Sequence, residues 1–351
     1  FSSNRRSDFL DLSGDMRLNY QHQILNRPSE EVSLKRAEHS LTSARLNFDR
    51  QDLQLEGQVV DDYYNLVQNI RRLEIEKQRL AQSHANLELA QRKFEVGLIA
   101  EVEALRLQVE MLQAEASFAQ AETAIEQRRD ILRETLGLDT AAPLDVATEV
   151  KYELHPVDAN RALELGLARR SDMQRAEIFE KIRALDLEDT RRRNGMTANL
   201  NADLSLQGRG GDIGDISRNF ERNRWSVNIQ VALPLIDSGQ RRASLNQARI
   251  ALEQSRISRE QQRRQIIRQV RDATRNLSEA ERQIDLRQAA LRFAQRTYDV
   301  EQSRFELGLA DSQQLLQAQG DLTRAQIDEL EAIITYQREL KNVRVATMAH
   351  L

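Results

Sequence analysis

The stretch Lys93-Phe94-Glu95-Val96-Gly97-Leu98 returns later in the chain as Arg304-Phe305-Glu306-Leu307-Gly308-Leu309. Gly97 pairs with Gly308, so the two copies are offset by 308 − 97 = 211 positions. The match extends at this offset without a gap. It includes the pairs Ser33/Ser244, Ala37/Ala248, Leu66/Leu277, Leu80/Leu291 and Gln108/Gln319. A single fixed offset over this length indicates an internal repeat, which predicts two structurally equivalent halves.

Within each half, one apolar position recurs every seven residues. These positions are Val59, Leu66, Leu73, Leu80, Leu87 and Phe94, and then Val270, Leu277, Ile284, Leu291, Tyr298 and Phe305. A sustained seven-residue period keeps one narrow seam of a helix against its neighbours, as in coiled coils. From Pro28 to Val96 such a helix would be on the order of 100 Å long at 1.5 Å per residue. The period therefore predicts one very long helix in each half.

Each long helix is interrupted once, at Gly97 or at Gly308, and helical patterning resumes from Ala100 to Leu136 and from Asp311 to Met348. A glycine adopts the left-handed backbone conformation that ends a helix and lets the chain reverse. Each half is thus predicted to be a long antiparallel helical hairpin. A single glycine of this kind is usually only a turn, but repetition of the whole string favours a shared function of the two tips.

Two segments before the second hairpin alternate bulky apolar residues with small or polar ones. These are Ala198–Leu206 and Trp225–Leu233. A period of two is typical of strands, and the Gly-, Asp- and Arg-rich stretch between them predicts a β-hairpin with a long polar loop. In the first half, Met16–Gln21 aligns with Val227–Ala232 at the 211 offset, so a strand is expected there too. Its partner strand is expected upstream of Phe1.

These strands have about the length of a tilted membrane-spanning strand, with one apolar and one polar face. A half-buried sheet of a soluble protein shows the same alternation, but no other predicted segment is free to cover the apolar face. We therefore expect the following residues to face lipid: Leu200, Leu204, Trp225, Val227, Ile229 and Val231. The residues expected to face water are Asn199, Asp203, Asn228 and Gln230.

Composition argues against several other classes of protein. Only 13 Gly and 4 Pro occur among 351 residues, which favours long helices, and the net charge of −4 gives no bulk reason to expect nucleic acid. No run approaches the roughly 18 apolar residues of a membrane-spanning helix, so contact with a bilayer would have to use strands. The chain has no cysteine and its five histidines are scattered. We expect no metal, no cofactor and no enzymatic activity.

The duplicated strand-plus-hairpin plan, the tips Val96–Ala100 and Leu307–Ala310, and the junction Leu233–Gly239 together resemble the TolC-like outer-membrane efflux protein family. The resemblance covers nearly the whole chain. It implies a mainly α fold with a small β part. In that fold, a homotrimer forms a twelve-stranded outer-membrane β-barrel that continues into a periplasmic α-helical tunnel.

The family resemblance also implies a function and partners. It implies a passive exit duct of a tripartite efflux or type I secretion system, in the outer membrane of a Gram-negative bacterium and extending into the periplasm. The duct would carry small molecules or proteins, driven by an inner-membrane pump or ABC transporter. A periplasmic adaptor, also called a membrane fusion protein, would dock at the tips.

On this plan the chain divides into five parts. They are 1–27 in the first β-hairpin, 28–136 in the first helical hairpin with its tip at 96–100, 137–195 in an equatorial side domain, 196–237 in the second β-hairpin, and 238–351 in the second helical hairpin with its tip at 307–311.

The resemblance implies two sets of candidate site residues. The residues expected to dock the adaptor are Val96, Gly97, Leu98, Leu307, Gly308 and Leu309. The pore entrance is expected at Asp311, Gln314 and Gln317. Family members often carry acidic residues just after the second tip, whereas this chain has Gln314 and Gln317 there, which weakens the case for an anionic gate. The first half also has Asn26-Arg27-Pro28 where the second has Asp237-Ser238-Gly239.

Two other interpretations remain open, a soluble periplasmic coiled-coil scaffold and the adaptor itself. An adaptor should carry Gly- and Val-rich lipoyl-like strands on both sides of one hairpin, whereas this chain has two predicted hairpins and few glycines. A scaffold would leave the strands around Ala198 and Trp225 without a purpose.

Overall fold

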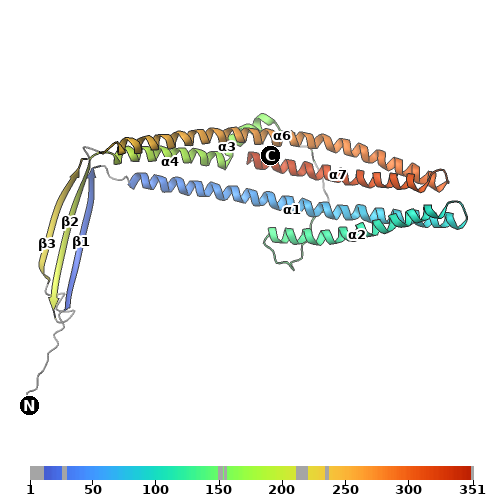
Figure 1. Cartoon of the computed structure of the whole chain (residues 1–351), viewed down its shortest axis with the longest axis horizontal. Coiled ribbons are helices and arrows are strands. Elements are labelled where there is room, and N and C mark those ends of the chain that lie inside the picture. Colours follow the sequence, from blue (N-terminus) through green and yellow to red (C-terminus); the bar gives the residue numbers. More distant parts are fainter. Residues whose placement is uncertain are drawn as a thin grey trace, which may run out of the picture. The chain divides into compact units, whose positions relative to one another are not determined.

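The computed structural model describes residues 12–25, 30–148, 153, 156–210, 220–233 and 237–348. Its elements, labelled in Figure 1, are β1 (Leu12–Leu25), α1 (Glu30–Glu95), α2 (Glu101–Thr135), α3 (Ala159–Arg169), α4 (Ser171–Arg193), β2 (Thr197–Gly210), β3 (Phe220–Ala232), α6 (Gln240–Glu306) and α7 (Ser312–Thr347). The expected class, mainly α with a small β part, is confirmed. The chain forms two compact units, residues 1–45 with 175–260 and residues 46–174 with 261–351.

The two long helices contain 66 residues in α1 and 67 in α6, about 100 Å of helix each at 1.5 Å per residue. The seven-residue seam of α6 is its buried face. Val270, Leu277, Ile284, Tyr298 and Phe305 are all buried. The seam of α1 ends differently, because Phe94 is 43% exposed whereas its repeat equivalent Phe305 is 1% exposed. The two halves therefore share a backbone plan but pack differently at their tips.

Both hairpin turns close with the same backbone hydrogen bonds. The N–H of Gly97 donates to the carbonyl of Phe94 at 2.9 Å, and the N–H of Leu98 donates to the carbonyl of Lys93 at 2.8 Å. The equivalent atoms 211 residues later, around Gly308, make the same two bonds at 3.0 and 2.8 Å. The φ angles of Gly97 and Gly308 are 72° and 77°. This pair of bonds is the Schellman motif, so the prediction that these glycines end helices and reverse the chain is confirmed.

The three strands form one antiparallel sheet in the order β1-β2-β3. The predicted hairpin is present as β2 and β3, which contain 14 and 13 residues and so extend beyond the predicted segments. The strand expected at Met16–Gln21 is the middle of β1, which also contains 14 residues. The loop between β2 and β3 lies largely outside the described residues.

The prediction of one continuous helix from Ala159 to Arg193 is wrong at Arg170. This residue has an extended backbone, with φ −62° and ψ 124°, and it separates α3 from α4. Its guanidinium donates to both carboxylate oxygens of Asp172 at 3.0 and 2.6 Å. An acid in the first turn of a helix is favoured by the helix dipole, and Asp172 occupies that place in α4. No glycine or proline marks the break, so the residue pattern carried no signal for it.

The short helix α3 packs closely against α6 and α7. Ala162 of α3 belongs to a buried cluster with Ile266 and Val270 of α6 and Tyr336 of α7. Gly166 makes the close approach possible, since a Cβ atom there would lie 2.9 Å from Cγ2 of Val270 and 3.3 Å from the carbonyl oxygen of Ala346. Any larger residue at position 166 requires its neighbours to move.

Two polar contacts join the first helical hairpin to the second beside the tips. The carboxylate of Glu103, on α2, accepts a hydrogen bond from the N–H of Ser312 at 2.9 Å and another from its hydroxyl. The ammonium of Lys93, on α1, donates to the carbonyl of Phe305 and lies 4.6 Å from the centroid of its ring. A carboxylate at a helix N-terminus and a cation at a helix C-terminus are both favoured by the helix dipole. The first hairpin thus caps both helices of the second.

We predict that Gly166→Ala lowers the stability of the protein by about 1 to 2 kcal/mol, because an overpacked contact outweighs the gain in helix propensity. The matched control is Gly320→Ala in α7, where an added Cβ would meet nothing within 4 Å. That change should be neutral or raise stability by up to about 1 kcal/mol. Thermal loss of the helical circular dichroism signal measures both. Equal midpoints for the two variants would contradict the close packing of α3.

We also predict that Glu103→Ala loosens the first turn of α7, since the buried Ser312 N–H loses a charged acceptor. A loss of about 1.4 kcal/mol corresponds to roughly tenfold faster local opening. Hydrogen–deuterium exchange of the amides that follow Asp311 measures this opening. The exposed Glu101, two residues earlier on the same helix, is the control, and Glu101→Ala should leave these amides unchanged. Identical exchange in both variants would show that the cap contributes nothing.

Candidate functional site

The three strands place their apolar side chains on one face of the sheet. The register sets Leu18 opposite Leu204, and Leu204 opposite Trp225. Directly opposed residues of an antiparallel sheet share a face. The face formed in this way consists of Met16, Leu18 and Tyr20 of β1, Leu200, Leu204 and Leu206 of β2, and Trp225, Val227, Ile229 and Val231 of β3. All six residues predicted to face lipid therefore lie together on it.

This apolar face is largely uncovered. Its exposed members range from 37% for Leu204 to 77% for Trp225. An uncovered apolar surface of this extent marks an interaction or membrane site. Sequence reasoning did not assign the β1 residues to it, although the signal was available. Adding 211 to 16, 18 and 20 gives 227, 229 and 231, the three aliphatic positions of β3.

The reverse face of the sheet is polar. Asn19 of β1 donates to the carboxylate of Asp203 of β2, and the hydroxyl of Ser226 of β3 reaches the same carboxylate at 3.5 Å. The neighbouring cross-strand rows are Gln21, Asn201 and Asn228, and then Gln23, Asn199 and Gln230. The four residues predicted to face water all lie on this side. The sheet thus separates an apolar surface from a hydrogen-bonded polar one.

The two hairpin tips present aliphatic side chains to solvent. Val96, Leu98, Leu307 and Leu309 are 67 to 75% exposed. The next residue at each tip behaves differently, because Ile99 and Ala310 pack against the buried cluster beneath. An added Cβ at Gly97 or Gly308 would meet nothing within 4 Å, so in the protomer these glycines are required by their positive φ and not by space.

Lys93 is a charged residue that sequence reasoning did not single out. Its side chain lies behind the first tip, and the residue is only 7% exposed. Burial lowers the pKa of its ammonium, while the nearby charge of Glu306 acts in the opposite direction. The repeat equivalent Arg304 is exposed and pairs with Glu301 at 2.8 Å. The buried cation is therefore specific to the first hairpin.

The expected pore-entrance residues lie at the start of α7. Asp311 is the N-cap of this helix, and its carboxylate accepts a hydrogen bond from the N–H of Gln314 at 2.9 Å. Gln314 and Gln317 are exposed. The amide of Gln317 donates to both carboxylate oxygens of Asp321, each at 3.1 Å. Asp321 was missed from sequence, although its position four residues after Gln317 places it on the same helix face.

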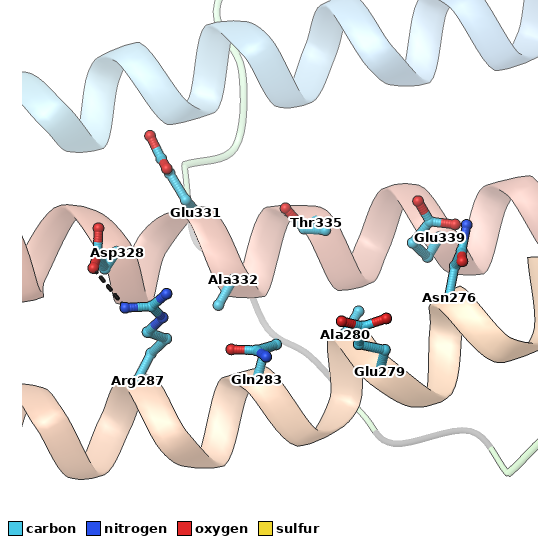
Figure 2. A pocket seen from close by; sticks show the side chains of 10 residues that line it. All are labelled: Asn276, Glu279, Ala280, Gln283, Arg287, Asp328, Glu331, Ala332, Thr335 and Glu339. Carbon is cyan, nitrogen blue, oxygen red and sulfur yellow. Dashed lines mark hydrogen bonds and ion pairs between the residues drawn. The ribbon is translucent and has the colours of Figure 1, made fainter.

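A hydrophilic groove runs between α6 and α7 (Figure 2). Its volume is about 340 Å³, and its lining consists of Asn276, Glu279, Ala280, Gln283, Arg287, Asp328, Glu331, Ala332, Thr335 and Glu339. Arg287 reaches across it to Asp328 at 2.8 Å. Glu331 points towards α1, whose Gln68 amide donates to it at 3.4 Å. Its ion pair and hydrogen bonds thus connect neighbouring helices.

Two searches of the described part of the chain were negative. None of the helices there is long and apolar enough to span a bilayer. No group of three or more His, Cys, Asp or Glu side chains in that part could hold a metal ion.

Comparisons with solved structures show the fold. An outer membrane protein, VceC from Vibrio cholerae, is 16% identical with a TM-score of 0.81, over 95% of this chain and 80% of that one. A membrane protein from Pseudomonas aeruginosa is 17% identical with a TM-score of 0.79, over 97% and 85%. The MtrE outer membrane channel of Neisseria gonorrhoeae is 16% identical with a TM-score of 0.73, over 97% and 80%.

Sequence comparisons show the family. No curated protein matches the chain. The family model described as outer membrane efflux protein matches residues 14–138 and 162–348, which is well over half of the chain and includes β1, β2, β3 and both helical hairpins. The chain therefore belongs to the outer membrane efflux protein family.

Proposed function

We propose that the chain is one protomer of a homotrimeric duct that conducts small molecules or proteins out of the periplasm and catalyses no reaction itself. Membership of the family makes the chain an outer-membrane exit duct of an efflux system. The observation that carries the finer proposal is the two-faced sheet, whose uncovered apolar side backs onto a hydrogen-bonded polar side. Type I secretion is the alternative use of the same duct.

The sheet has the dimensions that a membrane-spanning barrel wall requires. A tilted spanning strand needs about 9 to 11 residues, and β1, β2 and β3 contain 14, 14 and 13. In a barrel wall, side chains alternate between lipid and a polar interior, as they do here. Twelve strands in a trimer would take four from each protomer. The strand expected before Met16 falls outside the described residues.

The helical hairpins supply the periplasmic part of the proposed duct. Helices of about 100 Å are long enough to cross much of an aqueous compartment. Within this part we assign residues 137–195, which contain α3 and α4, to a side domain that links the two hairpins. Transport would be passive in this chain, and an inner-membrane pump or ABC transporter would provide the energy.

The tips are proposed as the docking site of the periplasmic adaptor. Val96, Leu98, Leu307 and Leu309 gather exposed aliphatic groups at the turns of two otherwise polar hairpins, and such patches usually mark interaction sites. A trimer would present six tips. Gly97 and Gly308 leave open space around their backbones, which allows a partner to approach closely.

The entrance of the proposed pore lies at Asp311, Gln314 and Gln317. Threefold repetition turns a single group into a ring, which is how pores obtain selectivity from side chains. Asp311 supplies one charge per protomer, and Asp321, held by Gln317, supplies a second one further along α7. These rings would give the duct a mild preference for cations.

The facing of the barrel is tested by two neighbouring substitutions. Ile229→Arg places a cation on the apolar face, at a predicted cost of roughly 2 to 4 kcal/mol near the bilayer midplane, whereas Asn228→Arg places it on the polar face at little cost. We expect Ile229→Arg to reduce the amount of protein assembled in the outer membrane severely. Asn228→Arg should assemble normally. Equal assembly of both variants would refute the assignment of the faces.

The docking proposal is tested with Leu309→Asp. A charge at this exposed position should block adaptor binding without disturbing the protomer, so the variant should reach the outer membrane as a trimer but fail to support export. Leu309→Met keeps an apolar side chain and should export normally. Full export by a variant that combines Leu309→Asp with Val96→Asp would exclude the tips as the docking site.

A further inference from the structure

The long helix α6 carries a second apolar seam that nothing in the described part of the chain covers. This outer seam consists of Leu286, Phe293, Val300 and Leu307, which are spaced by seven residues and are 50 to 75% exposed. Each member follows a residue of the buried seam by two positions, as Val300 follows Tyr298. Two residues correspond to about 200° around a helix of 3.6 residues per turn. The two seams therefore lie on nearly opposite sides of α6.

The same arrangement occurs at α2. Ala104, Leu107 and Ala114 are buried against the other helices. On the other side lies an outer seam that begins at the tip with Leu98 and continues through Val102, Leu105, Val109 and Leu112, all 50 to 72% exposed. The spacing alternates between three and four residues, as at the contact positions of a coiled coil. A helix with seams on opposite sides is built for a neighbour on each side.

Each of these helices has its inner neighbours within the protomer. Arg287 of α6 pairs with Asp328 of α7 at 2.8 Å. Arg79 of α1 pairs with Glu110 of α2 at 2.7 Å. Asn86 of α1 donates to Gln319 of α7 at 3.2 Å, which joins the two hairpins. The outer seams of α2 and α6 therefore remain as two unmatched apolar surfaces on one chain.

The two outer seams match each other in register. If the turns at Gly97 and Gly308 lie at one height, antiparallel helices set residue i of α2 opposite residue 405 − i of α6, because 97 + 308 = 405 and both helices rise 1.5 Å per residue. This rule produces four consecutive layers. They are Leu98/Leu307, Leu105/Val300, Leu112/Phe293 and Ala119/Leu286. Every layer is apolar on both sides.

Charges beside the seams agree with this register. At the Leu112/Phe293 layer, Glu115 of α2 lies on one side, and Arg292 and Arg296 of α6 lie on the other. All three of these side chains belong to exposed residues. Opposite charges that flank an apolar seam select the partner and the orientation of a coiled coil.

We infer that the outer seam of α2 packs against the outer seam of α6 in a second copy of this chain, antiparallel and in the 405 − i register. Each copy offers one seam of each kind, so the contact is head-to-tail, and a rotation that closes produces a ring. The number of copies, three, rests on the proposed function. Val96 and Leu309 are not part of the seam and stay free for the adaptor.

The absence of cysteine from the chain makes the inference directly testable. Two double variants place cysteines in matched layers, Leu112→Cys with Phe293→Cys and Leu105→Cys with Val300→Cys. A disulfide needs Cα atoms within about 7 Å, which a seam layer provides. After mild oxidation of the protein in detergent, both variants should run as covalent dimers and trimers on non-reducing gels. Reduction should return them to monomers.

Two controls fix the register and the face. Leu105→Cys with Phe293→Cys is one heptad out of register, about 10 Å along the helix, and should not cross-link. Leu112→Cys with Gln295→Cys uses an exposed position about 200° away from Phe293 on α6 and should not cross-link either. Cross-linking of the out-of-register pair as strong as that of the matched pairs would overturn the inference. Bonds formed only within single chains would overturn it as well.

The native mass of the unaltered protein separates this inference from the proposed function. A monomer in detergent would refute the trimeric duct. A trimer in which neither matched pair cross-links would leave the duct intact and show that the seams face something else, such as the adaptor.

Discussion

Burial of one apolar residue every seven positions holds the helical part of this protein together. In α6 that seam includes Ile284, Tyr298 and Phe305, and it packs into clusters with α7 and with the first hairpin. A strict seven-residue repeat keeps the contact on one narrow stripe over many turns, which makes helices of more than 60 residues stable side by side. The glycine turns then set where each stripe reverses, and the position of the tips follows.

The protomer leaves three apolar surfaces uncovered: one face of the sheet, the two tips, and the outer seams of α2 and α6. Soluble monomers rarely expose apolar patches of such extent. Each surface calls for a different neighbour. The flat, two-faced sheet suits lipid, the tips suit a protein partner, and the paired seams suit another copy of the same chain. One sequence thus encodes an assembly whose parts are completed by different partners.

Much of the fold could be predicted from sequence because it follows periods of seven and two and is repeated at a fixed offset. The reversals at Gly97 and Gly308 and the hairpin of β2 and β3 are of this kind. The break at Arg170 could not be predicted, because it depends on an ion pair with Asp172 and not on a helix-breaking residue. The burial of Phe305 but not Phe94 was equally hidden, since it depends on contacts between hairpins. Function at the tips was inferred from repetition, but Lys93 became visible only through its burial.

The central claim is that this chain is complete only as a membrane-inserted trimer, and the native mass of the purified protein tests it most directly. Light scattering combined with size-exclusion chromatography measures that mass, with the detergent contribution subtracted. The account predicts a single species of three chains, about three times the 40.4 kDa of one chain, that precipitates when detergent is removed. A monodisperse monomer that stays in solution without detergent would contradict it.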